Sequence, residues 1–297
     1  MKTVILALIS PFRAHLYNFN LLRLPEANSN IELAIVSDKE TLTKYVPEKL
    51  AKYTISVNLA EIIENVFFLS VKDIESIVQS KLEKKQIVFL HTEEEMFLDH
   101  VAKLNEQFKL PGLYIAENLK FRNKFVMKQE LAKYSHQSFF NIPRFALINA
   151  ENNLPNNFSF PLICKPLNLA GTIGVKKCSN HTEFKAYRQG NKDDIICEEY
   201  ISGELFHCDA LIINGGICFM LCGKYFAPID IATIEMNYLG SETITDDKLI
   251  KKLLLATTAV ANYLQPPNGM IHVEFMIKND MVYFIEIGKR PAGGWHP

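Results

Sequence analysis

The chain has few of the features that mark nucleic-acid-binding or membrane-spanning proteins. Its 32 Lys and Arg nearly balance its 33 Asp and Glu, and its pI is near 6.7, so it lacks the basic surface that nucleic acid or an anionic membrane attracts. No apolar run approaches the roughly eighteen residues of a membrane span. No internal repeat or low-complexity tract is present. We therefore expect neither nucleic acid nor a membrane as a partner.

The sequence also has no Cys-x-x-Cys pair, although it contains six cysteines. All six fall in one central segment, several of them in apolar runs typical of buried strands: Cys164, Cys178, Cys197, Cys208, Cys218 and Cys222. This placement favours free core thiols over disulfides or a zinc site. The opening "MKTVILALISPFR" has only a short apolar run and no small-residue cleavage site, which favours a buried first strand over a signal peptide. Together these observations predict a cytoplasmic protein.

The first third of the chain alternates between strand-like and helix-like segments. Strand patterns occur in "TVILALIS", "IELAIVSD", "VFFLSV" and "QIVFLHT", and helical stripes occur between the first two and in "KDIESIVQSKLEKK". This alternation predicts a small parallel sheet up to about residue 115. Residues 92–109 have the pattern of an amphipathic helix that ends before Pro111 and Gly112. No G-x-G-x-x-G follows the first strand, so the pattern does not support dinucleotide binding of the Rossmann type.

Two apolar runs near the end of the chain each carry one glutamate. Glu274 and Glu286 lie in "GMIHVEFMI" and "MVYFIEI", which have the pattern of two strands joined by a turn at residues 278–280. With an odd-length loop centred on Asp280 the glutamates face each other about 5 Å apart, whereas a two-residue Asn279–Asp280 turn would place them on opposite faces. Because like charges repel, a facing pair predicts a hard divalent cation, Mg²⁺ held together with substrate phosphates. The alternative is a solvated sheet face on which two carboxylates align by chance.

The middle third contains residues suited to a nucleoside triphosphate. Lys165 closes the apolar run of "FPLICKP", and glycines at 171 and 174 follow, where backbone N–H groups can approach phosphate oxygens closely. The alternative is a lysine that reaches solvent, followed by a glycine hairpin turn. The segment is not a Walker A loop, since Lys-Ser or Lys-Thr does not follow the second glycine. Farther on, Glu198 and Glu199 end an apolar strand, either as part of a site or as a solvated strand end.

In their order along the chain, five motifs resemble those of the ATP-grasp superfamily, and within it the carboxylate–amine (amino acid) ligases. They are "HTEEEMFLDHVAKLNEQFKLPG", "RNKFVMKQEL", "FPLICKP" with its glycine loop, "EEYISGE" and "HVEFMIKNDMVYFIEIGKRPAGG". They resemble the end of a pre-ATP-grasp domain, the helix and the strand of two phosphate lysines, the adenine-binding linker, and the metal-binding hairpin with its arginine. The resemblance implies an α/β chain, α+β in its ATP-grasp part. A Rossmann-like pre-ATP-grasp domain would span residues 1–115, and two ATP-grasp subdomains would span 116–195, with the glycine loop, and 196–297, with the hairpin.

The resemblance also implies roles for the matching residues in binding ATP and Mg²⁺. Lys124 and Lys165 would contact the α- and β-phosphates, under a lid of Gly171, Thr172 and Gly174. The adenine edge would meet backbone atoms of Glu198, Glu199, Tyr200 and Ile201, and the ribose would meet the side chain of Glu204. Glu274 and Glu286 would hold the metal, and Arg290 would contact the transferred phosphoryl group. Lys224 would be either a γ-phosphate contact or a surface lysine.

Two departures from the family pattern bear on activity. Many relatives place a metal-binding asparagine two residues after the second glutamate, where this chain has Gly288. That difference favours the amino acid ligase branch over the D-alanine–D-alanine ligase type. The chain also ends at Pro297, directly after a glycine-rich segment, where relatives continue. The resemblance therefore implies either a shortened C-terminal subdomain or a site that a homo-oligomer or a partner chain completes.

The implied activity is that of an ATP-dependent ligase. A small-molecule carboxylate would be phosphorylated, and an amine would attack the acyl phosphate, forming an amide and releasing phosphate in addition to ADP. Mg²⁺, the two phosphate lysines and Arg290 would stabilise the charge on the phosphoryl group. Because this chemistry needs no Ser–His or Cys–His nucleophile, His207 and His272 are expected to be structural. The alternatives are a nucleotide-binding pseudoenzyme or regulatory subunit, and another ATP-grasp ligase or carboxylase.

Overall fold

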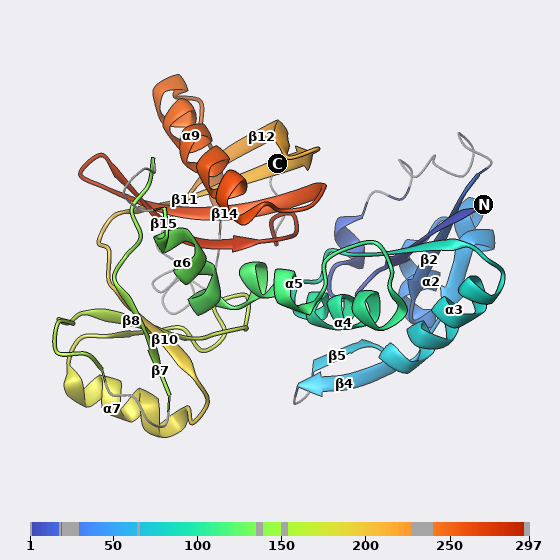
Figure 1. The fold of residues 1–297 in the computed structure, drawn as a ribbon, viewed down its shortest axis with the longest axis horizontal. Helices are drawn as coiled ribbons and strands as arrows, with labels where there is room; N and C mark the ends of the chain where they lie inside the picture. Colours follow the sequence, from blue (N-terminus) through green and yellow to red (C-terminus); the bar gives the residue numbers. More distant parts are fainter. Residues whose placement is uncertain are drawn as a thin grey trace. The chain divides into compact units, whose positions relative to one another are not determined.

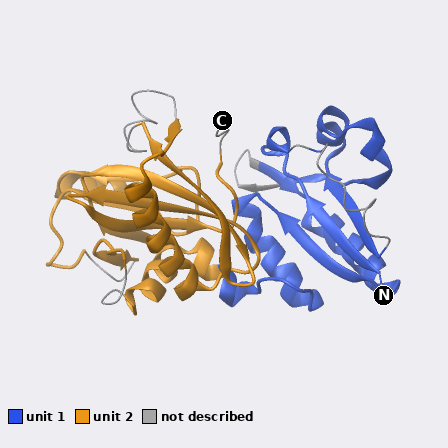
Figure 2. Cartoon of the chain, turned by 90° about the horizontal axis from the view of Figure 1, so that it is seen from above, with its two compact units in different colours: residues 1–118 blue, residues 119–297 orange. Residues whose placement is uncertain are grey.

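The computed structural model describes residues 2–17, 19, 30–63, 66–134, 139–149, 154–226 and 240–293. Contacts divide the chain into two compact units, Met1–Asn118 and Leu119–Pro297, which Figure 2 colours separately. The further boundary expected from the sequence at residue 195 stays a prediction. None of the described helices combines the length and the apolar composition that crossing a bilayer requires.

Unit 1 is built on a four-stranded parallel sheet, as the alternating pattern predicts. In the spatial order β3-β2-β1-β6, its strands are β1 (Thr3–Leu8), β2 (Ile31–Ser37), β3 (Thr54–Ser56) and β6 (Ile87–Thr92). Successive side chains of a strand point to opposite faces, so β1 supplies two apolar clusters. Val4 and Leu6 pack in the cluster that contains Val78, whereas Ala7 packs with Ala14 in the other. Apolar side chains thus cover both faces of this sheet.

The connections of unit 1 include helices and a separate ribbon. They are η1 (Ala14–Leu16), α2 (Lys39–Tyr45), η3 (Glu48–Tyr53), β4 (Leu59–Ile63), β5 (Val66–Leu69), α3 (Val71–Glu83), η4 (Glu95–Phe97) and α4 (Leu98–Phe108). The segment "VFFLSV" forms β5, which pairs antiparallel with β4, so its expected place in the parallel sheet is wrong. The helix predicted over residues 92–109 begins only at Leu98, because β6 continues through Thr92. Most of the helix predicted between the first two strands falls outside the described residues.

Unit 2 contains two antiparallel sheets, which complete the predicted α/β architecture. The chain reaches it through α5 (Ile115–Arg122), and α6 (Lys124–Ala132) follows. The first sheet has the order β7-β10-β8-β9, formed by β7 (Phe145–Ile148), β8 (Leu162–Pro166), β9 (Lys176–Cys178) and β10 (Ile195–Glu199). Helix α7 (His181–Gly190) covers one face of it through Phe184, which packs on the buried Cys164 and Cys197.

The second sheet carries five strands and one long helix. In the order β13-β12-β11-β14-β15 they are β11 (Glu204–Ile213), β12 (Gly216–Tyr225), β13 (Ser241–Thr243), β14 (Gly269–Lys278) and β15 (Met281–Gly288). Helix α9 (Asp247–Leu264) packs on β11 and β12, and α6 contacts both α9 and β15 (Figure 1). Helix α6 therefore lies where its side chains can reach the last hairpin.

The hairpin of β14 and β15 confirms one expectation and corrects another. Glu274 and Glu286 are Cα partners, as the sequence predicts. The turn, however, is the two-residue Asn279–Asp280 turn that was expected to separate them, with φ of 49° and 65° at its two residues. A β-bulge at Ile285 shifts the register by one residue and returns the two glutamates to opposing positions.

Candidate functional site

Lys165 and Glu198 form the buried centre of a charged cluster in unit 2. The Lys165 Nζ lies 3.0 Å from the Glu198 Oε1, and their side chains are 5% and 4% exposed. Strand alternation explains this placement, because the neighbouring Cys164 and Cys197 enter the apolar core on the opposite face. A solvent-reaching lysine and a solvated strand end are therefore both wrong descriptions of this pair.

Helix α6 adds two lysines one turn apart. Asn123 caps the helix, because its Oδ1 accepts hydrogen bonds from the backbone N–H groups of Phe125 and Val126. The helix therefore starts at Lys124. The Lys124 Nζ lies 3.2 Å from the Glu286 Oε1 and donates to the Leu169 carbonyl at 2.5 Å. One turn later, the fully buried Lys128 lies 3.4 Å from the second carboxylate oxygen of Glu198. The two lysines thus connect α6 to the hairpin and to β10.

Lys128 has further partners that hold the hairpin in place. Its Nζ donates to the carbonyls of Phe284 and Ile285 at 3.2 and 2.9 Å. Ile285 is the bulged residue, so the lysine satisfies a carbonyl at the irregular point of the ladder. Lys128 was not among the residues predicted from the sequence, although its spacing of four from Lys124 was a usable signal, since residues at i and i+4 share one helix face.

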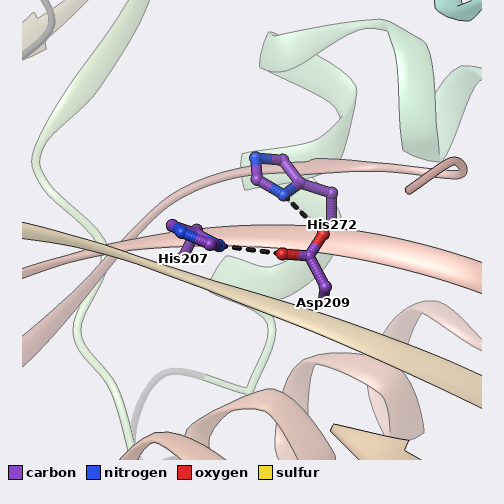
Figure 3. A group of neighbouring side chains, drawn as sticks. All are labelled: His207, Asp209 and His272. Atoms are coloured by element: carbon purple, nitrogen blue, oxygen red, sulfur yellow. Dashed lines mark hydrogen bonds and ion pairs between the residues drawn. The ribbon is translucent and has the colours of Figure 1, made fainter. Parts of the chain in front are cut away.

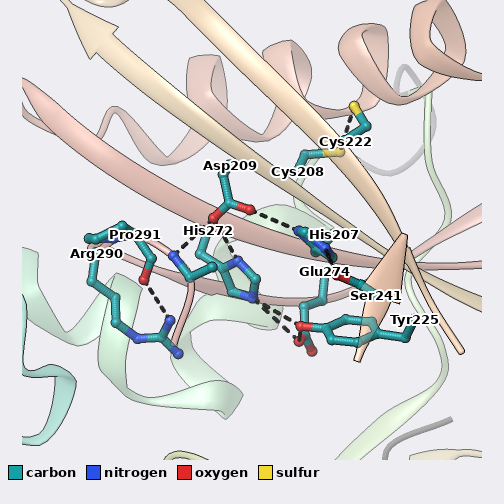
Figure 4. A network of polar contacts seen from close by, with 11 residues as sticks. His207, Cys208, Asp209, Cys222, Tyr225, Ser241, His272, Glu274, Arg290 and Pro291 are labelled. Atoms are coloured by element: carbon teal, nitrogen blue, oxygen red, sulfur yellow. Dashed lines mark hydrogen bonds and ion pairs between the residues drawn. The ribbon is translucent and has the colours of Figure 1, made fainter. Parts of the chain in front are cut away.

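Glu274 lies among polar side chains of neighbouring strands. The Tyr225 hydroxyl donates to its Oε1 at 2.9 Å, and the His272 Nε2 lies 3.4 Å from the same atom (Figure 4). Burial lowers the pKa of His272, but the carboxylates of Asp209 and Glu274 outweigh it and raise this pKa to about 9. The Glu274 carboxylate therefore faces a cationic imidazole on one side and a hydroxyl on another.

Burial and neighbouring opposite charges act against each other on the pKa values of Glu286, Lys165 and Lys128. Burial favours the neutral form of Glu286, but Lys124 and Lys165 outweigh it and hold the pKa at about 2. Burial likewise lowers the pKa of Lys165, whereas Glu198, Glu286 and Glu274 raise it by a larger amount. For Lys128, burial dominates and lowers the pKa to about 8. Because Glu286 and Glu274 both raise the pKa of Lys165, the charge at the end of β8 lies near the hairpin carboxylates.

The glycine loop between β8 and β9 has backbone torsion angles that glycine adopts more easily than other residues. Gly171, Thr172 and Gly174 have φ of 63°, 65° and 74°, in the left-handed region. A Cβ at Gly174 would also lie 2.7 Å from Pro166, so only glycine fits there. The loop is partly exposed and begins beside Lys165. The N–H groups of Ile173 and Val175 donate to the carbonyls of Ala170 and Thr172, so an anion would meet those of Gly171, Thr172 and Gly174.

The linker after β10 is partly engaged by the protein itself. The N–H groups of Glu199 and Tyr200 donate to the carbonyls of Arg144 and Pro161, at 2.8 and 3.4 Å. The Glu199 carboxylate pairs with Arg144 at 3.1 Å, and Lys177 lies 3.8 Å from the centroid of the Tyr200 ring. Ile201 is buried. A ligand meeting this linker would therefore rely on carbonyl oxygens and on the remaining N–H groups.

The two remaining lysine and arginine candidates differ in their surroundings. Lys224 on β12 forms an ion pair with Glu204 on β11, with both side chains partly exposed. The Arg290 Nη1 donates to the Pro291 carbonyl at 2.9 Å. Burial and Glu274 raise the pKa of Tyr225 and the Arg290 charge opposes this rise, whereas at Glu286 Arg290 adds to the lowering of the pKa by Lys124 and Lys165. Arg290 therefore lies near the hairpin glutamates, whereas Lys224 is joined to the ribose candidate, Glu204.

The assembled groups can bind a polyphosphate together with a divalent cation. The buried Lys124 and Lys165 and the nearby Arg290 supply positive charge, and a glycine loop supplies backbone N–H groups. Facing carboxylates offer the oxygen ligands that Mg²⁺ prefers.

Comparisons with known proteins agree with this geometry. A model of the ATP-grasp domain matches residues 158–297, which include Lys165, Glu198, Glu274 and Glu286. Residues 158–297 are an ATP-grasp domain. The glycine loop, the linker and the bulged hairpin all lie within it, whereas Lys124 and Lys128 reach the site from α6, ahead of the matched segment.

Relatives of the ATP-grasp domain support the predicted carboxylate–amine ligase branch. The chain is 27% identical over 196 residues to dapdiamide A synthase of Enterobacter agglomerans. The matched segment covers 59% of this chain and 44% of that protein. It is 23% identical over 218 residues to the L-arginine-specific L-amino acid ligase of Bacillus subtilis, covering 66% and 52%. The fold matches the crystal structure of an L-amino acid ligase from Bacillus licheniformis with a TM-score of 0.68 at 19% identity, over 98% of this chain and 67% of that one. The chain spans about half the length of the curated relatives it matches.

Proposed function

We propose that this chain is an ATP-dependent carboxylate–amine ligase that forms an amide and releases ADP and phosphate. The observation that carries the proposal is the facing pair of Glu274 and Glu286 beside Lys124 and Lys165, with three of these residues inside an ATP-grasp domain. The names of its relatives, an L-amino acid ligase and a dapdiamide synthase, support amide formation from small carboxylates and amines.

The site fits ATP through an exchange of ion-pair partners. Without nucleotide, Lys124 lies against Glu286, so each neutralises the other. In the proposed complex, Lys124 and Lys165 contact the α- and β-phosphates, and the glycine loop of Gly171, Thr172 and Gly174 covers the triphosphate. Glu286, released from Lys124, then becomes a metal ligand opposite Glu274. Every buried charge keeps a partner in both states, which is the condition for burying charge at all.

The linker and the strand after it would hold the nucleoside. We assign the adenine edge to backbone atoms of Glu198, Glu199, Tyr200 and Ile201, because the Glu198 side chain is already bound between Lys128 and Lys165. The ribose hydroxyls are assigned to Glu204, which would turn from Lys224 toward the sugar. This exchange would free the Lys224 ammonium for the γ-phosphate.

The carboxylate oxygens of Glu274 and Glu286 suit Mg²⁺, which when bound would act as a Lewis acid on the phosphoryl oxygens. The acid substrate attacks the γ-phosphorus, the bond to the leaving ADP breaks, and an acyl phosphate forms. Arg290 and Lys224 stabilise negative charge on the phosphoryl group during this transfer. The amine then attacks the acyl carbon, and inorganic phosphate leaves with the bonding electrons while the amine loses a proton.

We further propose a reducing, cytoplasmic setting and a site that a second copy or a partner chain completes. The first part follows from the free cysteines, of which Cys164, Cys178, Cys197, Cys208 and Cys222 are buried. The second part carries forward the partner that the family resemblance implies. Sedimentation of the purified protein with and without Mg-ATP would measure self-association.

ADP release across pairs of amino acids, with and without a second amine, tests the proposed activity. We expect calorimetric binding of Mg-ATP and ADP formation that requires an acid substrate. The matched control is Glu274→Gln with Glu286→Gln, which keeps the side-chain size but removes the charge that holds the metal. Binding without ADP formation for every pair would favour a nucleotide-binding subunit, and absence of binding would reject the nucleotide site itself.

A further inference from the structure

Three buried side chains meet on one face of the five-stranded sheet, beside the proposed metal ligands. Asp209 and His207 are two residues apart on β11, and His272 on β14 is the cross-strand partner of Asp209. Figure 3 shows both imidazoles turned toward the carboxylate. From the sequence the histidines were expected to be structural and Asp209 was given no role, because the register that joins strands about sixty residues apart cannot be read from either strand.

The Asp209 carboxylate is the shared acceptor of this group. It accepts from the Nδ1 of His207 at 2.8 Å and from the Nδ1 of His272 at 2.9 Å, one on each oxygen. An ionised carboxylate only accepts, so each ring carries a hydrogen on Nδ1. Burial raises the pKa of Asp209, but the two histidines outweigh it and hold this pKa well below its usual range. The three side chains are close enough for a metal, yet these hydrogen bonds already use the atoms that a metal would need.

The two histidines extend from Asp209 in different directions. The His272 Nε2 lies 3.4 Å from the Glu274 Oε1 and 3.5 Å from the Tyr225 hydroxyl. The His207 Nε2 lies 3.0 Å from the Ser241 hydroxyl on β13. The hydrogen bonds of the two imidazoles thus differ: His272 Nε2 approaches the carboxylate of a proposed metal ligand, whereas His207, although the cross-strand partner of Glu274, directs its Nε2 to Ser241.

Asp209 also holds the segment that carries Arg290. The backbone N–H of Ala292, two residues after Arg290, donates to the Asp209 Oδ1 at 3.0 Å. This is the oxygen that accepts from His272. One carboxylate oxygen thus connects the residue beside the metal ligand with the segment of the proposed catalytic arginine (Figure 4).

From these contacts we infer that Asp209 is a positioning residue of the ligase site. Through His272 it fixes the orientation of Glu274 toward the metal, and through the Ala292 N–H it fixes the Arg290 segment. The inference rests on the proposed function and adds to it the group that aligns metal and arginine. Groups hydrogen-bonded to metal ligands typically change metal affinity or activity by about 10–100-fold when they are replaced.

A matched pair of variants, His272→Asn and His207→Asn, tests the first arm. In each, the asparagine amide can still donate to Asp209 in place of Nδ1, and the Nε2 contact is lost. Mn²⁺ affinity in the presence of ADP, measured by electron paramagnetic resonance, should fall at least tenfold for His272→Asn and by several-fold less for His207→Asn. If His272→Asn does not fold, Tyr225→Phe removes the other hydrogen bond to the same carboxylate oxygen, with the same expected direction.

Asp209→Ala tests the second arm, because it removes the oxygen that accepts both from His272 and from the Ala292 N–H. At saturating Mn²⁺, turnover should recover in His272→Asn but stay at least tenfold low in Asp209→Ala, with an unchanged KM for ATP. Equal Mn²⁺ losses in the two histidine variants, or full recovery of Asp209→Ala, would overturn the inference. The inference would also be overturned if the purified chain held one zinc ion and His207→Asn removed it. If the wild-type chain binds no Mn²⁺ with ADP, the proposed function itself fails, which is a different result.

Discussion

The two units of this chain place charged side chains in opposite ways. Leaving histidine aside, the described part of unit 1 buries one such side chain, Glu95, whereas that of unit 2 buries Arg122, Lys124, Lys128, Lys165, Glu198 and Asp209. The Lys81–Glu32 pair of unit 1 has side chains 16% and 29% exposed, but Lys128 and Glu198 of unit 2 are 0% and 4% exposed. Similar lysine–glutamate pairs thus exist in two very different environments.

This difference indicates what each unit is built for. Removing two charges from water costs more than their attraction returns unless further hydrogen bonds complete the pair, so a buried cluster is a poor way to stabilise a fold. Unit 1 is held by apolar packing on both faces of a parallel sheet. Unit 2 has buried lysines and glutamates where apolar residues would pack without the free-energy cost of removing charge from water. We attribute their retention to a ligand that is itself highly charged.

The largest expected effect comes from Lys128→Met, which removes the fully buried cation. It leaves two carbonyls of β15 without their donor and Glu198 with one lysine instead of two. We expect unit 2 to lose about 3 kcal/mol of its free energy of unfolding. This loss is measured by urea unfolding that is followed through hydrogen exchange of the segments β10 and β15. A loss below about 1 kcal/mol would show that the burial of this charge has little energetic consequence.

Arg290→Ala should act on turnover and leave nucleotide binding nearly intact. An interaction made only in the transition state changes turnover more than ground-state affinity. We expect substrate-dependent ADP formation to fall about 100-fold, or about 2.7 kcal/mol. The matched control is the neighbouring Lys289→Ala, whose ammonium donates to the Asn268 carbonyl at 3.2 Å. Equal effects of the two substitutions on ADP formation would remove Arg290 from its proposed role.

Lys165→Ala and Lys124→Ala should each weaken Mg-ATP binding at least tenfold, or about 1.4 kcal/mol. Each removes a positive charge from a polyphosphate site that also holds two glutamates. Titration calorimetry measures the affinity, with Lys176→Ala, an exposed lysine of the same sheet, as the control. Unchanged affinity in both variants would contradict the assignment of these lysines to ATP.

The sequence predicts the β14–β15 hairpin of this site better than it predicts the contribution of helix α6. Apolar runs with period-two spacing predicted both strands and the facing glutamates. The reason was wrong, because the turn has two residues and a bulge at Ile285 restores the register. A bulge adds one residue without changing the apolar pattern, so the strands alone could not reveal it. The presence of a strand follows from local pattern, whereas its pairing depends on its neighbours.

Lys128 and Asp209 show a second limit of the sequence. A lysine near a helix start normally faces solvent, whereas Lys128 is buried against the carbonyls of β15 and the carboxylate of Glu198. Asp209 gains its partners from β14 and from the segment after β15, far along the chain. Unit 1 was easier to predict because its alternating apolar segments form an apolar core, apart from the ribbon of β4 and β5.

The smallest expected effect completes the comparison of the two units. Lys81→Met in unit 1 removes a partly exposed partner of Glu32, so we expect a loss below about 1 kcal/mol at neutral pH. The hydrogen bond from Lys81 is the main cause that lowers the pKa of Glu32. A lowered carboxyl pKa stabilises the fold above its unfolded value of about 4.3, and this contribution is lost as pH falls through the folded value. The stability difference between wild type and Lys81→Met, measured by urea unfolding of unit 1, should therefore shrink in acid. A difference as large as that of Lys128→Met, or one that grows below pH of about 4, would refute the distinction drawn between the two units.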